Sequence, residues 1–122
     1  MKKIHRMSDC ERKIMEFIWA AKRPVTTQEI VQYLPEARTW KQSTVVTFLS
    51  RLIKKGLLKG TRIGKANYYE PNITEEEYKR FETMEFIKDV YKGSAYGFLE
   101  TLINSNSLTK EDIENLLKRL KK

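Results

Sequence analysis

The chain has 122 residues, of which 40% are hydrophobic, and it carries a formal net charge of +8 at pH 7. This length allows one compact domain with a small appendage, and the absence of any long apolar run excludes a membrane-spanning helix. The first residues do not resemble a signal peptide, so we expect a soluble protein of the cytoplasm.

The charge is distributed unevenly along the chain. Residues 1–71 hold 15 Lys and Arg residues against 6 acidic residues, which gives +9, whereas residues 72–122 hold 9 against 10, which gives −1. A polyanionic partner is therefore expected to bind the first part only.

The inventory of reactive side chains is small. Cys10 and His5 are the only cysteine and histidine, and the chain has no glycine-rich phosphate loop. An internal disulfide and a zinc site are therefore not expected, and we predict no enzymatic activity, no metal and no cofactor. Cys10 is spaced for one helix face with Ile14, Phe17 and Ile18, which favours a buried structural thiol.

Capping patterns place the first two helices. Ser8 with Glu11 three residues later forms a capping box, which predicts a helix to about Ala21, before Pro24. Thr26 with Glu29 repeats the pattern and predicts a second, short helix through Leu34. Pro35 ends it, and a connecting loop is expected to lead to Trp40.

A third helix follows Trp40. Val45, Phe48, Leu49 and Leu52 recur at helical spacing and predict a face that packs against a core, and Gly56 suits the left-handed conformation of a helix C-terminus. The opposite face contains no acidic side chain, and its members are Gln42, Ser43, Val46, Thr47, Ser50, Arg51 and Lys54.

Such a face suits the major groove of DNA. Amides and hydroxyls can pair with base edges, Arg and Lys reach guanine or phosphate, and the apolar Val46 can meet a thymine methyl group. The alternative is an ordinary solvated helix surface. The absence of acidic side chains favours nucleic acid, because surface helices usually mix Glu with Lys.

A hairpin is predicted directly after this helix. Leu57–Arg62 and Asn67–Glu70 flank the turn Ile63–Ala66, and Arg62 and Lys65 lie at or near its tip. A basic tip beside a reading helix can follow phosphates or enter a minor groove. The fold class predicted for residues 1–71 is therefore a winged helix-turn-helix, in a chain that is mainly α with a small β-hairpin.

Three further helices are predicted in residues 72–122, after caps at Thr74 with Glu77 and at Thr109 with Asp112. These helices are too short to bury their apolar stripes alone, so we expect them to pair two copies of the chain. Packing onto the same chain's first domain is the alternative. The expected dimerisation residues are Tyr78, Phe81, Ile87, Tyr91, Phe98, Leu99, Leu102, Ile113, Leu116, Leu117 and Leu120.

The amino-acid sequences of three segments, in their order along the chain, resemble the penicillinase repressor family of the BlaI, MecI and CopY type. These are Val25–Ile30, Trp40–Gly56 and the strand Tyr68–Pro71, of which Trp40, Ser43–Val45, Leu49–Leu52 and Lys54–Gly56 are the most specific. The resemblance covers nearly the whole chain. It implies a homodimer that represses resistance genes from a palindromic operator, with the N-terminal domain on double-stranded DNA and the C-terminal helices pairing the subunits.

The resemblance also assigns individual residues. It implies operator or phosphate contacts for Ser43, Thr44 and Thr47, a further basic contact for Arg51, and a wing with Arg62 and Lys65. Trp40 is interpreted as bracing the reading helix rather than as a phosphate contact.

In the penicillinase branch, induction involves an inducing protease that cuts an Asn-Phe bond in the dimerisation region. The bond at the corresponding position of this chain is Thr101–Leu102. This departure places antibiotic-triggered cleavage in question, and the missing C-terminal cysteine pairs disfavour the copper-responsive branch. Two alternative functions stay open: a regulator of another winged-helix family released by a small molecule, and a winged-helix module that binds protein.

Overall fold

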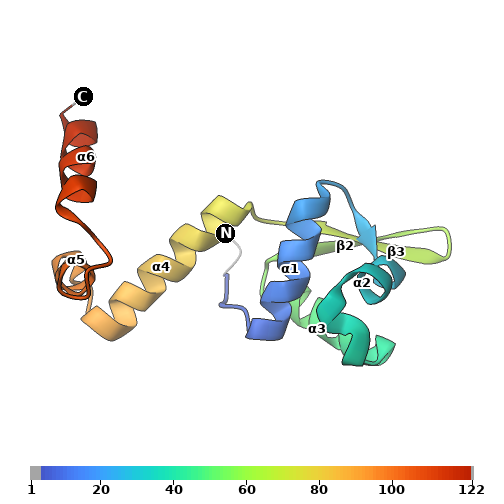
Figure 1. Cartoon of the computed structure of the whole chain (residues 1–122). Helices are drawn as coiled ribbons and strands as arrows, with labels where there is room; N and C mark the ends of the chain where they lie inside the picture. Colours follow the sequence, from blue (N-terminus) through green and yellow to red (C-terminus); the bar gives the residue numbers. More distant parts are fainter. Residues whose placement is uncertain (1–3, 122) are drawn as a thin grey trace. The chain divides into compact units, whose positions relative to one another are not determined.

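The computed structural model describes residues 4–121 and divides the chain into two compact units, residues 1–78 and 79–122. The N-terminal unit contains three α-helices, a short 3₁₀ helix and a three-stranded antiparallel sheet (Figure 1). This confirms the predicted fold class of a mainly helical chain with a winged helix-turn-helix. The N-terminal unit continues past the predicted boundary at Pro71 to Tyr78.

The first two helices of the N-terminal unit begin where the capping residues predict. Helix α1 spans Asp9–Ala21 and α2 spans Thr27–Tyr33, each preceded by a complete capping box, at Ser8 with Glu11 and at Thr26 with Glu29. The segment after α2 was predicted to be a connecting loop. It instead forms the 3₁₀ helix η1 (Pro35–Thr39). Proline fits this first turn because it lacks an N–H that would need a partner there.

Helix α3 spans Gln42–Lys54 and packs its apolar stripe into the core. Val45, Leu49 and Leu52 are at most 1% exposed, together with Ile14 and Ile18 of α1. Gly56 follows with a φ of 82°, and the N–H of Leu57 donates to the carbonyl of Leu52. The predicted glycine end of the helix is therefore confirmed.

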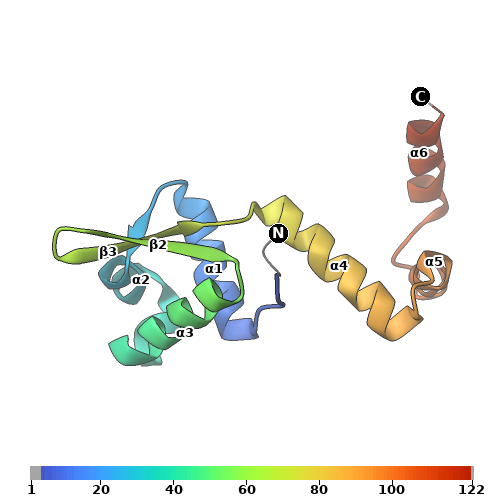
Figure 2. The same ribbon diagram turned by 180° about the vertical axis from the view of Figure 1, so that it is seen from behind.

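Strands β2 (Leu58–Ile63) and β3 (Ala66–Pro71) form the hairpin, with Ile63 paired to Ala66 across a two-residue turn. Gly64 in this turn has a φ of 62°, a conformation that glycine adopts without strain. A third strand that was not predicted, β1 (Val25–Thr26), pairs with the other edge of β3. Figure 2 shows the hairpin tip extending beyond the helices of this unit.

Two predictions about single residues are wrong. Cys10 is half-buried rather than buried. Tyr78 belongs to the N-terminal core and not to a dimer surface, since it is 1% exposed and its hydroxyl oxygen accepts a hydrogen bond of 2.8 Å from the N–H of Met7. Its ring also lies 6.1 Å from the ring of Trp19.

The C-terminal unit is built from helices. Helix α4 (Glu75–Tyr91) begins with the predicted cap, in which the N–H of Glu77 donates to the hydroxyl of Thr74. Helices α5 (Ala95–Asn104) and α6 (Lys110–Leu120) follow, the latter with the predicted capping box at Thr109.

Aromatic rings hold α4 to α5. The rings of Phe86, Tyr91 and Phe98 lie 5.5 to 5.9 Å from one another. Offset and edge-to-face pairs at such separations are favourable beyond the area that they bury.

Candidate nucleic-acid interface

The face of α3 opposite the core is exposed along its whole length. Of the side chains predicted to read DNA, only Thr44 is half-buried, and the others on α3 are exposed. Because Val45, Leu49 and Leu52 fix the rotation of the helix, this face cannot turn inward. The structure therefore keeps the acid-free face available to a partner.

Two side-chain contacts lie near the start of this helix. The rings of Trp40 and Phe48 meet edge to face with centroids 5.3 Å apart. This contact supports the interpretation of Trp40 as a brace. The hydroxyl of Thr47 donates to the carbonyl of Ser43 at 3.0 Å, so its proton is used within the helix. What Thr47 offers to a partner is its methyl group and an oxygen lone pair.

The wing carries its cations at the exposed tip. Arg62 is the exposed next-to-last residue of β2 and Lys65 lies in the turn, and neither has an ion pair within the part of the chain that the structure describes. Lys59 differs, since its ammonium lies 3.2 Å from the carboxylate of Glu70 on β3. The uncompensated charge of the hairpin is therefore concentrated at its tip.

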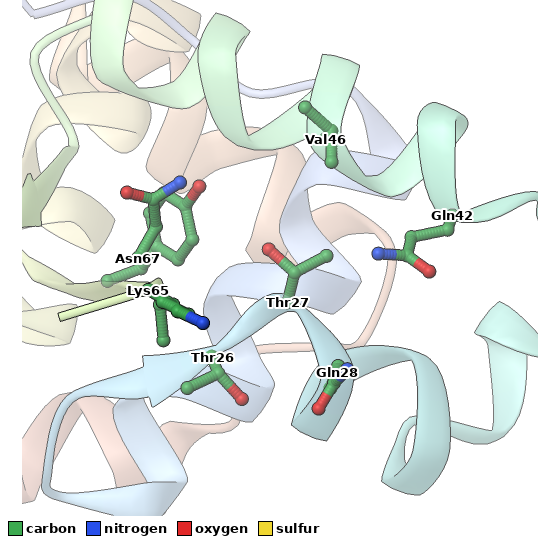
Figure 3. Close-up of a pocket in the computed structure, with 9 residues that line it drawn as sticks. Thr26, Thr27, Gln28, Gln42, Val46, Lys65 and Asn67 are labelled. Carbon is green, nitrogen blue, oxygen red and sulfur yellow. The ribbon is translucent and has the colours of Figure 1, made fainter. Parts of the chain in front are cut away.

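A hollow of about 360 Å³ lies between α3 and the hairpin. Its walls come from the start of α2, from α3 and from β3, and Figure 3 shows Gln42 and Val46 of α3 facing Thr27 across it. Lys65 and Asn67 close it from the hairpin. The residues around it are Thr26, Thr27, Gln28, Gln42, Val46, Lys65, Ala66, Asn67 and Tyr69.

Most of these residues have polar side chains and none has a carboxylate, so the hollow suits a ligand rich in hydrogen-bond acceptors. It brings together three of the predicted site residues, Gln42, Val46 and Lys65, whereas Arg51 and Lys54 lie at the other end of α3. Sequence reasoning missed Thr27, Gln28 and Asn67. The capping box at Thr26 marked the start of α2, but only the tertiary fold brings that start against α3 and β3.

An ion pair neutralises the acid at the start of α2. The guanidinium of Arg23 donates to both carboxylate oxygens of Glu29, and the N–H of Thr26 donates to the same carboxylate at 3.0 Å. The hydrogen bond from Arg23 is the main cause that lowers the pKa of Glu29, and the N–H of Thr26 adds to it. The same pair raises the pKa of Arg23. The carboxylate of Glu29 is therefore engaged within the protein.

The C-terminal unit presents apolar rather than basic surface. Helices α5 and α6 enclose a second hollow of about 290 Å³, whose lining is almost wholly apolar. Leu116 and Leu117 are each 49% exposed and Leu120 is 80% exposed. The lining residues are Tyr96, Leu99, Glu100, Ile103, Leu108, Ile113, Leu116, Leu117 and Leu120.

The remaining predicted positions of this unit are distributed differently. Ile87 is 6% exposed, whereas Phe81, Tyr91, Phe98 and Leu102 are half-buried. The Thr101–Leu102 bond lies inside α5, where the Thr101 hydroxyl donates to the carbonyl of Gly97 at 3.3 Å.

Two kinds of site are not found within residues 4–121. No group of three or more His, Cys, Asp or Glu side chains is placed to hold a metal ion. Among these same residues, no helix combines the length and the apolar character needed to cross a bilayer.

The comparisons with known proteins agree with this geometry. The family model described as penicillinase repressor matches residues 7–122. The chain is 34% identical to the penicillinase repressor of Bacillus licheniformis over 116 residues, which is 95% of this chain and 90% of the relative. It is 28% identical to the methicillin resistance regulatory protein MecI of Mammaliicoccus sciuri, over 98% of this chain and 97% of that protein.

Two solved structures share the N-terminal fold. The DNA-binding domain of the repressor BlaI matches with a TM-score of 0.54 and 42% identity, covering 64% of this chain and 94% of that one. Monomeric BlaI of Bacillus licheniformis, solved in complex with the blaP half-operator, matches with a TM-score of 0.52 and 41% identity over the same shares. The relatives are repressors and not enzymes, and the chain belongs to the penicillinase repressor family.

Proposed function

We propose that this chain is a homodimeric transcriptional repressor that occupies a palindromic operator with α3 and the wing of each protomer. The observation that carries the proposal is the hollow between α2, α3 and the wing, in which Gln42, Val46 and Lys65 converge without a carboxylate. An α-helix fits the major groove, about 12 Å wide, and a basic wing beside it can follow the adjacent backbone. Bound there, the protein blocks access to the promoter.

Pairing of two chains is the second part of the proposal. Leu116, Leu117 and Leu120 of α6 leave a contiguous apolar surface exposed around the α5–α6 hollow. Contiguous apolar patches on a soluble protein mark interaction surfaces. A second copy offers the same self-complementary surface, and two-fold symmetry then presents two reading helices to two half-sites.

The relatives suggest which genes are regulated. One is named for penicillinase and another for methicillin resistance. We infer a target of the β-lactam-resistance type and release by loss of pairing. Cleavage by an inducing protease at Thr101–Leu102 would require α5 to open locally, because that bond lies within the helix.

A salt titration tests the proposal. Fragments of the source genome bound by the full-length chain are selected, and the affinity for the shortest bound duplex is measured between 50 and 200 mM salt. We expect two chains per duplex and a log affinity that falls linearly with log salt. A single chain per duplex would contradict the dimer, and failure to retain any duplex at low salt would contradict the repressor.

A further inference from the structure

Another hollow of the N-terminal unit is lined by His5, Arg51, Lys54 and Lys55 and has a volume of about 330 Å³. It lies between the segment that precedes α1 and the end of α3. The backbone N–H of His5 donates to the carbonyl of Lys55 at 3.2 Å, which fastens the two segments together. The side chain of His5 is exposed.

The charges around this hollow are of one sign. Lys55 is compensated, because its ammonium donates to the buried carboxylate of Glu11 on the protein side. Arg51 and Lys54 are exposed and have no ion pair among the side chains of residues 4–121. No carboxylate lines the hollow, so at least two uncompensated cations and one imidazole face the same space.

Arg51 and Lys54 lie on the acid-free face of α3, which is proposed to meet the DNA bases. Arg51 and Lys54 follow Thr47 on the same side of α3, one and two turns farther along. Two turns of an α-helix advance about 11 Å, and the major groove is about 12 Å wide. When Thr47 lies over the base edges, the end of α3 therefore reaches the sugar–phosphate backbone that bounds the groove.

We propose that this hollow binds one backbone phosphate of the operator, outside the bases that α3 meets, with the His5 imidazole and the Arg51 guanidinium as donors. The proposal rests on the proposed function and adds to it a third DNA-contacting element, the segment before α1. The planar guanidinium matches the oxygens of a phosphate, and the imidazole supplies a further N–H. Lys54 contributes charge at the rim.

The experiment uses the full-length protein and the operator duplex selected above. His5→Ala removes the imidazole but keeps the backbone N–H that binds Lys55, so the variant should unfold at the same denaturant concentration as the wild type. We expect it to bind the duplex about five-fold more weakly. Lys13→Ala, which removes a cation near Glu36 on α1, should bind with little change.

Phosphate ethylation interference then locates the contact. In the wild type, ethylation of one phosphate outside each half-site should weaken binding, and that signal should disappear in His5→Ala. The losses from His5→Ala and Arg51→Ala should be less than additive, because both side chains hold the same group. Equal affinity and an unchanged interference pattern in His5→Ala would overturn the proposal while leaving the proposed function intact. No binding by the wild type would instead overturn the proposed function.

His5 is the only histidine, so its imidazole gives one NMR signal that reports on the hollow directly. We expect this signal to shift on addition of a stoichiometric amount of duplex, and to shift with inorganic phosphate alone only at concentrations near millimolar or above. Saturation by micromolar inorganic phosphate, with no shift on addition of duplex, would show a site for a free anion and overturn the proposal.

Discussion

The hydroxyl oxygen of Tyr78 accepts a hydrogen bond of 2.8 Å from the backbone N–H of Met7, across 71 residues of sequence. Both residues are buried, and the Arg12 guanidinium carbon lies 5.9 Å from the centre of the same ring. Close by in the fold, the indole N–H of Trp19 donates to the carbonyl of Ile73 at 3.0 Å. The first turn of α4 is thus part of the DNA-binding unit.

Tyr78→Phe removes this acceptor and leaves the N–H of Met7 buried without a partner. A buried unsatisfied donor costs about 1 to 3 kcal/mol, so the free energy of unfolding of the N-terminal unit should fall by this amount in urea titrations. Tyr96→Phe is the matched control, because Tyr96 is 74% exposed. A Tyr78→Phe variant as stable as this control would contradict the role assigned to the bond.

Glu11→Gln should destabilise the N-terminal unit more than a surface substitution does. Glu11 is 1% exposed, and its carboxylate accepts hydrogen bonds from the ammonium of Lys55 and from the backbone N–H of Ser8, the latter as part of the cap of α1. The amide preserves the cap but removes the charge that faces Lys55, which costs about 2 to 3 kcal/mol. Chemical denaturation measures the loss, and Glu16→Gln, at an exposed position of the same helix, should change stability by less than about 0.5 kcal/mol.

Local signals in the sequence predicted most of the helix boundaries. The capping pairs at Ser8, Thr26, Thr74 and Thr109 act within four residues of chain, so they can be read without knowing the fold. The same holds for the apolar stripe of α3 and for Gly56. The exposure of the opposite face of α3 could be predicted from that stripe, because burial of one side of a helix sets its rotation and leaves the other side in solvent.

The parts that were missed depend on distant segments. Strand β1 has two residues and exists only because β3 pairs with it, in the register Val25 to Tyr69. Tyr78 was assigned to the C-terminal stripe by its spacing, but its partners lie in and before α1. Gln28 and Asn67 carry no local signal of a site, since only the packing of α2, α3 and β3 brings them to one hollow.

The ion pair at the start of α2 should make stability depend on pH in acid. The hydrogen bonds to Glu29 hold its pKa in the native state below its ordinary value of 4.5. A lowered native pKa favours folding wherever the carboxylate is charged, so this contribution is present above the ordinary pKa and is lost as the pH falls through the native pKa.

Glu29→Gln isolates this effect. Wild type and variant should differ in free energy of unfolding by the same amount at pH 6 and pH 7, and the difference should decrease as the pH falls below 4.5, the ordinary pKa of the carboxyl group. Glu36→Gln serves as the control, because its carboxylate is 3.8 Å from Lys13 and exposed. A wild-type advantage that stayed constant as the pH fell below 4.5 would contradict the role of the Glu29 charge.

Substitutions at Thr47 should separate base reading from phosphate binding. Because its hydroxyl proton is used by the carbonyl of Ser43, we expect the methyl group to make the contact with a base. Thr47→Ser and Thr47→Ala should then lose about 1 kcal/mol of discrimination at one operator position, and Thr47→Val should retain it. Lys65→Ala should instead weaken binding to all sequences alike. Affinities for duplexes substituted at single positions measure both effects, and full discrimination by Thr47→Ser would show that the hydroxyl is the reading group.

Placing a charge on the exposed leucines of α6 tests how pairing supports operator binding. Leu117 is 49% exposed and lines the apolar hollow. If two chains pair there, as proposed, Leu117→Glu should be monomeric at micromolar concentration, because a charge cannot be buried there without a partner. Sedimentation measures the mass, and Asn115→Glu, at an exposed position that does not line the hollow, should remain dimeric.

Loss of the second half-site should weaken operator binding by about 100-fold or more, while the affinity for an isolated half-site stays the same. A monomeric variant that bound the full operator as tightly as the wild type would show that pairing contributes nothing to occupancy.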